Sequence, residues 1–162
     1  MAGSLRRQAK AAEPRQRRSS SPAHEANFAV VGLGASAGGL DACKKLLDAL
    51  PSETGMAFVL IQHLDPTHES MMVELLTGHT PMTVRLAEDG TRIEPEHLYL
   101  IPPGSYLAVR EGVLRLSAPR ERHGARLPFD FLLRSLAEDA GPRAICVCLL
   151  YTSDAADDLT RV

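Results

Sequence analysis

The sequence of 162 residues has few cysteines, no long apolar run and almost no net charge, and each of these absences excludes a class of protein. Its three cysteines, an odd number without metal-ligand spacing, argue against a disulfide framework and against a zinc site. No apolar run approaches the roughly 20 residues that span a bilayer, and the basic N-terminal residues are followed by polar ones, unlike in a secretory signal. A net charge of -2 gives no overall attraction to nucleic acid or to a membrane. The expected location is therefore the cytoplasm.

The composition that is present, 44% hydrophobic and 23% charged residues, is ordinary for one globular domain. Residues 1–27 differ, because they are polar and basic and contain too few apolar residues to bury a core. We interpret them as a disordered basic tail, and we favour a solvated tail over an arm that binds nucleic acid or a membrane. Residues 28–149 are the expected folded domain.

Apolar runs and helical spacings alternate along residues 28–149. Residues 28–33 and 56–61 have the composition of buried strands, and leucines between residues 40 and 50 predict a helix that Pro51 ends. This strand–helix–strand order is a βαβ unit, which implies parallel strands. Similar signals predict a helix over 70–76, strands over 82–86 and 98–101, a hairpin of 106–109 with 113–116, a helix over 129–140 and a strand over 144–150. The predicted fold class is α/β: a doubly wound, Rossmann-like, mostly parallel sheet with a β-hairpin excursion, incomplete at the C-terminus.

Side-chain spacing also predicts which residues of two elements face the core. The helix over 70–76 carries four apolar residues that we expect on one face: Met71, Met72, Leu75 and Leu76. Cys146 and Cys148 lie two apart in an apolar run, so on a strand they share one face, and we interpret them as small core residues.

Residues 34–38, Gly-Ala-Ser-Ala-Gly, fit the G-x-S-x-G pattern directly after a predicted strand and directly before a predicted helix. This is the context of a nucleophile elbow, in which glycines permit a sharp turn that exposes a serine at the carboxyl end of the sheet. Ser36 is therefore the candidate nucleophile. The N–H of Ala37, at a helix N-terminus, is a candidate donor for an oxyanion hole.

The same glycines allow two other interpretations. Gly32, Gly34 and Gly38 approximate a dinucleotide-binding fingerprint, whose glycines let a pyrophosphate approach a helix N-terminus. Their spacing departs from the standard form, and Gln62 and His63 stand where an acidic residue should bind ribose. A glycine turn without function is the third interpretation. The motif favours a hydrolase but leaves all three open.

His63 strengthens the hydrolase interpretation. Side chains at the carboxyl ends of neighbouring parallel strands converge on one crevice, and Ser36 and His63 each follow such a strand. A serine hydroxyl is a weak nucleophile until an imidazole takes its proton, so the two residues fit the roles of nucleophile and general base. For His63 alone, a histidine that merely ends a strand is the alternative. The other histidines follow no metal-ligand pattern, and we expect no metal.

Four stretches, residues 28–39, 59–66, 97–104 and 127–136, together resemble the catalytic domain of the chemotaxis receptor protein-glutamate methylesterases. The resemblance runs from residue 28 to about residue 149, and four ordered motifs are far more specific than one G-x-S-x-G. It implies that Ser36 is the nucleophile and His63 the general base in the hydrolysis of glutamate γ-methyl esters. It also implies glutamine deamidation in related members, no cofactor, and the cytoplasmic part of a methyl-accepting chemotaxis receptor as the partner.

Two departures from the family pattern affect regulation and activity. Many members carry a phosphate-accepting receiver domain before the esterase, whereas only the basic tail precedes residue 28 here, so we expect no regulation by aspartyl phosphate within this chain. The version without a receiver resembles the N-terminal module of larger proteins that fuse the methylesterase to a downstream methyltransferase.

The second departure concerns the third catalytic residue, an aspartate that the resemblance implies in a glycine-rich turn just after the last predicted strand. By direct count this position falls on Ala155, with Asp154 one residue early and only a weak substitute, and the glycines are absent. We interpret residues 150–162 as a non-native tail, for example the product of a frameshift. In a serine protease, disabling this residue lowers turnover by about 10⁴, so the chain as written is predicted to be nearly inactive.

Overall fold

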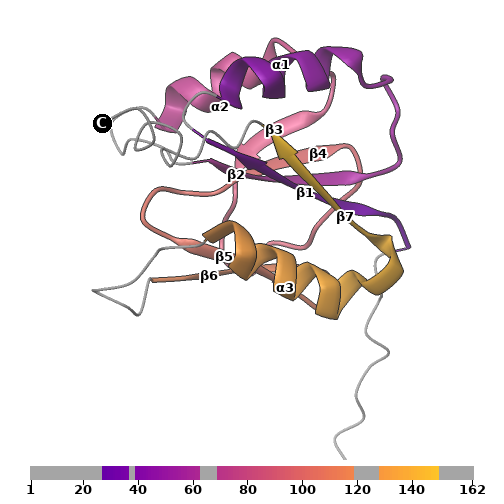
Figure 1. The fold of residues 1–162 in the computed structure, drawn as a ribbon, viewed down its shortest axis with the longest axis vertical. Coiled ribbons are helices and arrows are strands. Elements are labelled where there is room, and N and C mark those ends of the chain that lie inside the picture. The colour runs from indigo at the N-terminus through magenta and orange to yellow at the C-terminus, as the bar shows by residue number, and fades with distance from the viewer. Residues whose placement is uncertain (1–26, 37–38, 63–68, 119–127, 150–162) are drawn as a thin grey trace, which may run out of the picture.

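The computed structural model describes residues 27–36, 39–62, 69–118 and 128–149 (Figure 1). The predicted elements are present with small shifts of their ends. In chain order they are β1 (Val30–Ala35), α1 (Leu40–Ala49), β2 (Ala57–Gln62), α2 (Glu69–Thr77), β3 (Thr83–Leu86), β4 (His97–Leu100), β5 (Tyr106–Arg110), β6 (Val113–Ser117), α3 (Pro128–Ala140), a 3-10 turn (Gly141–Arg143) and β7 (Ala144–Leu149).

Five of these strands form one parallel sheet in the order β3-β4-β2-β1-β7. The remaining two, β5 and β6, pair antiparallel as a separate hairpin. Helices α1 and α2 cover one face of the sheet, whereas α3 and the hairpin lie on the other (Figure 1). The predicted α/β class, with a mostly parallel sheet and a hairpin excursion, is confirmed.

The core has two layers because side chains of a strand alternate between the faces of the sheet. On β1, Val31 and Leu33 pack into the cluster beneath α1 and α2, together with Leu60 of β2. Val30 and Val59 belong to the opposite cluster, beneath α3 and the hairpin. Both central strands are apolar almost throughout, as expected for parallel strands that are covered on both faces.

The expectation that α2 buries four apolar residues on one face is wrong for two of them. Leu76 is fully buried and Met72 packs against the core, but Met71 is 60% exposed and Leu75 is 39% exposed. Adjacent residues on a helix lie about 100° apart, so when Met72 and Leu76 face the sheet, Met71 and Leu75 turn toward solvent. The sequence spacing did not determine which half of this wide apolar face the sheet would cover.

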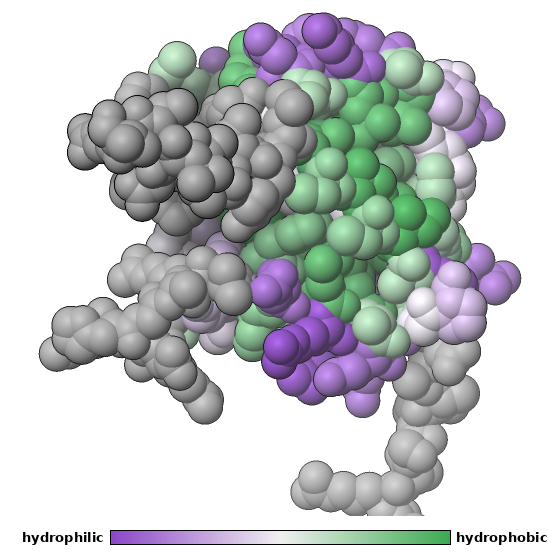
Figure 2. All heavy atoms as spheres, viewed as in Figure 1, coloured by the Kyte–Doolittle hydropathy of each residue, from purple (hydrophilic) through white to green (hydrophobic). Residues whose placement is uncertain are grey.

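The interpretation of Cys146 and Cys148 as core residues is also wrong, because both are exposed. They lie on β7, which is at one edge of the sheet and pairs only with β1 among the described strands. Its neighbour Ile145 is 41% exposed. Figure 2 shows a broad hydrophobic surface on the side of the molecule where β7 lies. An uncharged edge strand of this kind favours association with other chains.

The three thiols should differ sharply in their reactivity toward a maleimide at pH 8. Cys43 is fully buried on α1, and burial raises the pKa of its thiol to about 11, so it is neither accessible nor ionised. Cys146 and Cys148 are exposed, although partial burial and then the neighbouring Cys148 raise the pKa of Cys146. Mass spectrometry should therefore count two modified thiols in the folded protein and three in denaturant. Rapid modification of Cys43 in the folded protein would contradict the packing of α1.

Candidate active site

Ser36 lies at the point where β1 gives way to α1. The strand ends at Ala35, the carbonyl oxygen of Ser36 accepts the N–H of Gly39 at 2.8 Å, and α1 begins at Leu40. The chain thus passes from a buried strand to a helix through a tight turn, as the motif predicts. The side chain of Ser36 is partly buried.

Gly39 allows this turn to lie directly on the sheet. A Cβ atom at this position would come within 3.0 Å of the Cβ of Ala35 and within 3.0 Å of the carbonyl oxygen of Leu149. The start of α1 is therefore held against the ends of β1 and β7. Gly39 is the N-cap of α1 and provides no side-chain hydrogen bond to the first turn of the helix. The N–H groups of that turn have no intrahelical acceptors, and they lie at this rim of the sheet, where the helix dipole favours negative charge.

The sheet register brings three chain segments to the same rim. Ala35 pairs with Gln62 of β2 on one side and with Leu149 of β7 on the other. Ser36 and His63 are the next residues after the first of these pairs, so the predicted adjacency of the two strands is confirmed. His63 itself lies outside the described residues, as do three further residues of the predicted site: Ala37, Asp154 and Ala155.

The glycines of the alternative dinucleotide fingerprint have a different role from the one that it requires. Gly32 and Gly34 lie within β1, not in the turn, and they face α3. A Cβ on Gly32 would approach Leu136 to 3.0 Å, and a Cβ on Gly34 would lie 2.5 Å from the ring of Phe129. These glycines make room for a helix, so they are not available to a pyrophosphate. Gly38 lies outside the described residues.

In the sequence, Gln62 stands out only because it occupies a position where a ribose-binding site would need an acidic residue. In the structure it has a more specific environment. It is the last residue of β2 and is 7% exposed. Its carboxamide oxygen is buried and accepts no hydrogen bond among the described residues. A polar residue ending an otherwise apolar strand was the signal for this site in the sequence.

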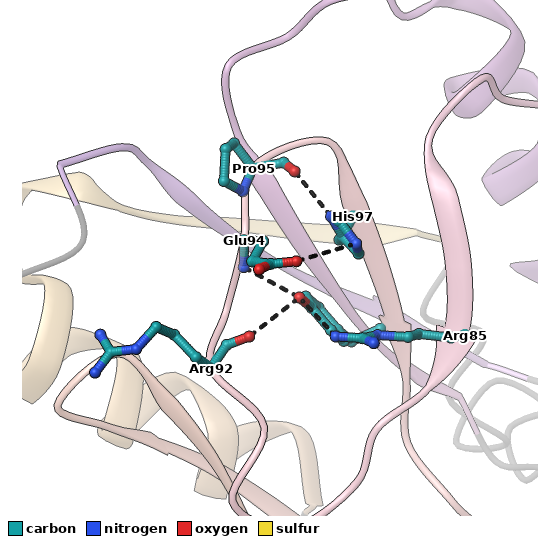
Figure 3. Close-up of polar contacts among 6 residues, drawn as sticks. Arg85, Arg92, Glu94, Pro95 and His97 are labelled. Carbon is teal, nitrogen blue, oxygen red and sulfur yellow. Dashed lines mark hydrogen bonds and ion pairs between the residues drawn. The ribbon is translucent and has the colours of Figure 1, made fainter.

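A second polar cluster surrounds Tyr99, which is fully buried on β4 (Figure 3). The Tyr99 hydroxyl accepts the N–H of Glu94 at 3.0 Å and donates to the carbonyl oxygen of Arg92 at 3.5 Å. The guanidinium of Arg85 lies 5.1 Å from the ring centroid, and the ring of His97 stacks at 5.7 Å. The hydroxyl of Tyr99 contacts main-chain groups of Arg92 and Glu94, which precede β4 in the chain. We interpret the cluster as a structural tie between the sheet and the segment before β4.

Among the described residues, no group of three or more histidine, cysteine, aspartate or glutamate residues is arranged to hold a metal ion. In the same residues no helix has the length and apolar character needed to cross a membrane.

The fold and the turn together define a doubly wound α/β protein with a serine between the first strand and the first helix of a parallel sheet. The chain belongs to the CheB methylesterase family, whose family model matches residues 31–159.

Curated relatives and a solved structure agree with this assignment. The chain is 36% identical over 131 residues to protein-glutamate methylesterase/protein-glutamine glutaminase 1 of Xanthomonas campestris, a match covering 77% of the chain and 36% of the relative. It is 38% identical over 140 residues to a protein of the same name from Photorhabdus laumondii, covering 82% of the chain and 39% of the relative. The crystal structure of the CheB methylesterase catalytic domain of Thermotoga maritima matches with a TM-score of 0.68 and 25% identity, over 78% of the chain and 69% of that domain. The chain thus spans little more than a third of the length of the curated relatives it matches.

Proposed function

We propose that this chain carries the amino-terminal part of a protein-glutamate methylesterase site, which hydrolyses γ-methyl esters of glutamate and also deamidates glutamine on chemoreceptors. The observation that carries the proposal is the position of Ser36 in a strand-to-helix turn, directly after Ala35, which the register pairs with Gln62, the residue before His63. The names of the relatives, which combine methylesterase and glutaminase, support both reactions.

The proposed reaction uses groups of the protein alone. The hydroxyl of Ser36 attacks the ester carbonyl carbon while His63 takes its proton. The negative charge that develops on the carbonyl oxygen is stabilised by the N–H of Ala37 and by the start of α1. His63 then returns the proton to the leaving methoxide, and methanol departs. Water hydrolyses the acyl-enzyme to release glutamate, and ammonia replaces methanol when the substrate is glutamine.

Acyl transfer of this kind needs no cofactor, and the proposed partner is the cytoplasmic part of a methyl-accepting receptor, which places the reaction in the cytoplasm. For the third catalytic position, we propose that residues 150–162 do not supply the family's aspartate. Because β7 runs parallel to β1 and ends at Leu149, a carboxylate just after that strand would reach the correct rim. Asp154 is one residue away from the position that the family pattern requires.

The proposal is tested by mapping where a fluorophosphonate probe reacts. The probe needs only an activated serine and a donor for its oxygen, so it reports on the site even when turnover is slow. Peptide mass spectrometry should place the adduct on Ser36, and Ser36→Ala should abolish it. Ser105→Ala, a change of a partly buried serine elsewhere, should leave labelling unchanged. An adduct on another serine, or none at all, would contradict the proposal, and saturable binding of a dinucleotide would favour the alternative.

A further inference from the structure

Gln62 is one of two buried polar residues among the described residues, and the two differ in their hydrogen bonding. Ser135, on α3, accepts the N–H of Val109 at 3.0 Å and donates to the carbonyl oxygen of Leu132 at 2.7 Å. The carboxamide oxygen of Gln62 is just as inaccessible, yet it accepts nothing within the described part of the chain. A buried acceptor without a donor destabilises the folded state, because it has lost its hydrogen bonds to water.

An apolar side chain of the same shape would avoid this cost, because the five residues of β2 before Gln62 are all apolar and buried. Buried groups without partners are rare in folded proteins and call for a specific explanation. Departures from otherwise consistent packing are concentrated at functional sites, where geometry is retained at the expense of stability. The neighbours of Gln62 in the fold therefore indicate which functional group it could support.

The alternation of β2 places Gln62 on the face of the sheet that α1 covers. Leu60, two residues earlier, packs in the cluster beneath α1 and α2, and residues two apart share a face. On that face the neighbour of Gln62 is Ala35, its partner in the register. Gly39 lies directly over Ala35, since a Cβ on Gly39 would be 3.0 Å from the Cβ of Ala35. The buried amide thus lies beside the turn that carries Ser36.

An unpaired acceptor therefore lies beside the start of a helix. The first turn of α1 has N–H groups without intrahelical partners, and its N-cap contributes no side-chain hydrogen bond. We infer that Gln62 is a positioning residue, whose carboxamide oxygen takes one main-chain N–H of the first turn of α1 when Ser36 is acylated. This hydrogen bond fixes the turn so that its other N–H groups point at the developing oxyanion. The inference rests on the proposed function and adds a residue to it.

The experiment compares Gln62→Met with Leu60→Met in the full chain. Methionine keeps the approximate shape of glutamine but accepts no comparable hydrogen bond. Leu60→Met introduces the same side chain on the same face of the sheet, away from the rim. Gln62→Met should slow labelling of Ser36 by a fluorophosphonate about tenfold, and its melting temperature should stay equal or rise because a buried unpaired oxygen is removed. Leu60→Met should leave labelling unchanged.

Two further readouts separate positioning from a general loss of structure. Gln62→Glu keeps an oxygen acceptor at the same place but adds a carboxyl group whose charge opposes the oxyanion, so its labelling should be faster than that of Gln62→Met and slower than that of wild type. The midpoint of the pH profile of labelling should be the same in Gln62→Met and wild type, because the general base is unchanged.

The outcomes separate this inference from the proposed function. Labelling of Gln62→Met at the wild-type rate, or a fall in labelling that tracks a fall in melting temperature, would overturn the role of Gln62 while Ser36 remained the nucleophile. Absence of a Ser36 adduct in the wild-type chain would instead remove the esterase site and the role of Gln62 with it.

Discussion

Replacing His63 with alanine is expected to slow hydrolysis of a receptor γ-methyl ester by about 10²-fold in this chain, and not by the full loss seen in an intact triad. In a serine protease, removing the histidine costs about 2 × 10⁶ in turnover, whereas removing the aspartate alone costs about 3 × 10⁴. The effects are not additive. When the aspartate is already absent, removing the histidine should lower turnover only by the ratio of these two losses, which is about 10². The size of the loss therefore reports whether a carboxylate takes part.

The measurement is release of methanol from a methylated receptor fragment under single-turnover conditions. His79→Ala is the matched control, because His79, just after α2, pairs with Asp48 of α1 at 2.9 Å and has no part in the proposed reaction. A loss near 10⁶ for His63→Ala would mean that a carboxylate such as Asp154 completes the site, and our interpretation of residues 150–162 would be wrong. A loss of less than threefold would exclude His63 as the general base.

Local signals in the sequence were sufficient for most of the elements. The βαβ unit over residues 28–61 has its periodicities and its glycine turn within one short stretch, and the structure has the same unit. The hairpin was predicted from residues 110–112, where Glu111 and Gly112 have φ angles of 54° and 67°. The contact that holds this hairpin turn against α3 could not be predicted. The turn donates N–H groups to the carboxylate of Asp139, which is remote in the sequence.

The predictions of which side chains are buried were wrong where burial depends on neighbours that are remote in sequence. The apolar run of β7 indicates a strand, but whether Cys146 and Cys148 are covered depends on what lies beyond the edge of the sheet. Likewise, the spacing of α2 defines an apolar surface but not the angle at which the helix meets the sheet, and Met71 turns outward. Periodicity gives the relative directions of side chains, and only tertiary packing assigns those directions to core or solvent.

The site was predictable to the extent that it depends on strand order. Ser36 follows from the motif and its place after a strand, and the pairing of Ala35 with Gln62 confirms that the two candidate catalytic residues follow neighbouring strands. The role of Gly34 was assigned by the motif to the turn, whereas the structure assigns it to packing against α3. Nothing in the local sequence connects Gly34 with Phe129, because the contact spans almost the whole folded part of the chain.

Gly34→Ala should be the most destabilising single-methyl change among the described glycines. The added Cβ would lie 2.5, 2.6 and 2.7 Å from three atoms of the Phe129 ring, well inside ordinary van der Waals contact. Either the ring must leave its place on α3 or β1 must move, and overpacking of this kind costs about 1–3 kcal/mol. Urea unfolding should show the loss as a lower midpoint with an unchanged slope. Because Ser36 follows β1 directly, labelling of Ser36 should slow as well.

A double-mutant cycle identifies the cause. Phe129→Leu removes the ring atoms that the methyl group would meet, so Gly34→Ala should cost at least about 1 kcal/mol less in the Phe129→Leu background than in the wild type. Gly78→Ala is the matched control, since its Cβ would find nothing closer than 3.7 Å, and it should change stability by less than about 0.5 kcal/mol. Additive losses in the cycle would show that Gly34 is required for its backbone conformation and not for the approach of α3. That result would reopen the possibility that Gly34 serves a ligand, because its close contact with Phe129 is the reason for excluding it from a dinucleotide-binding turn.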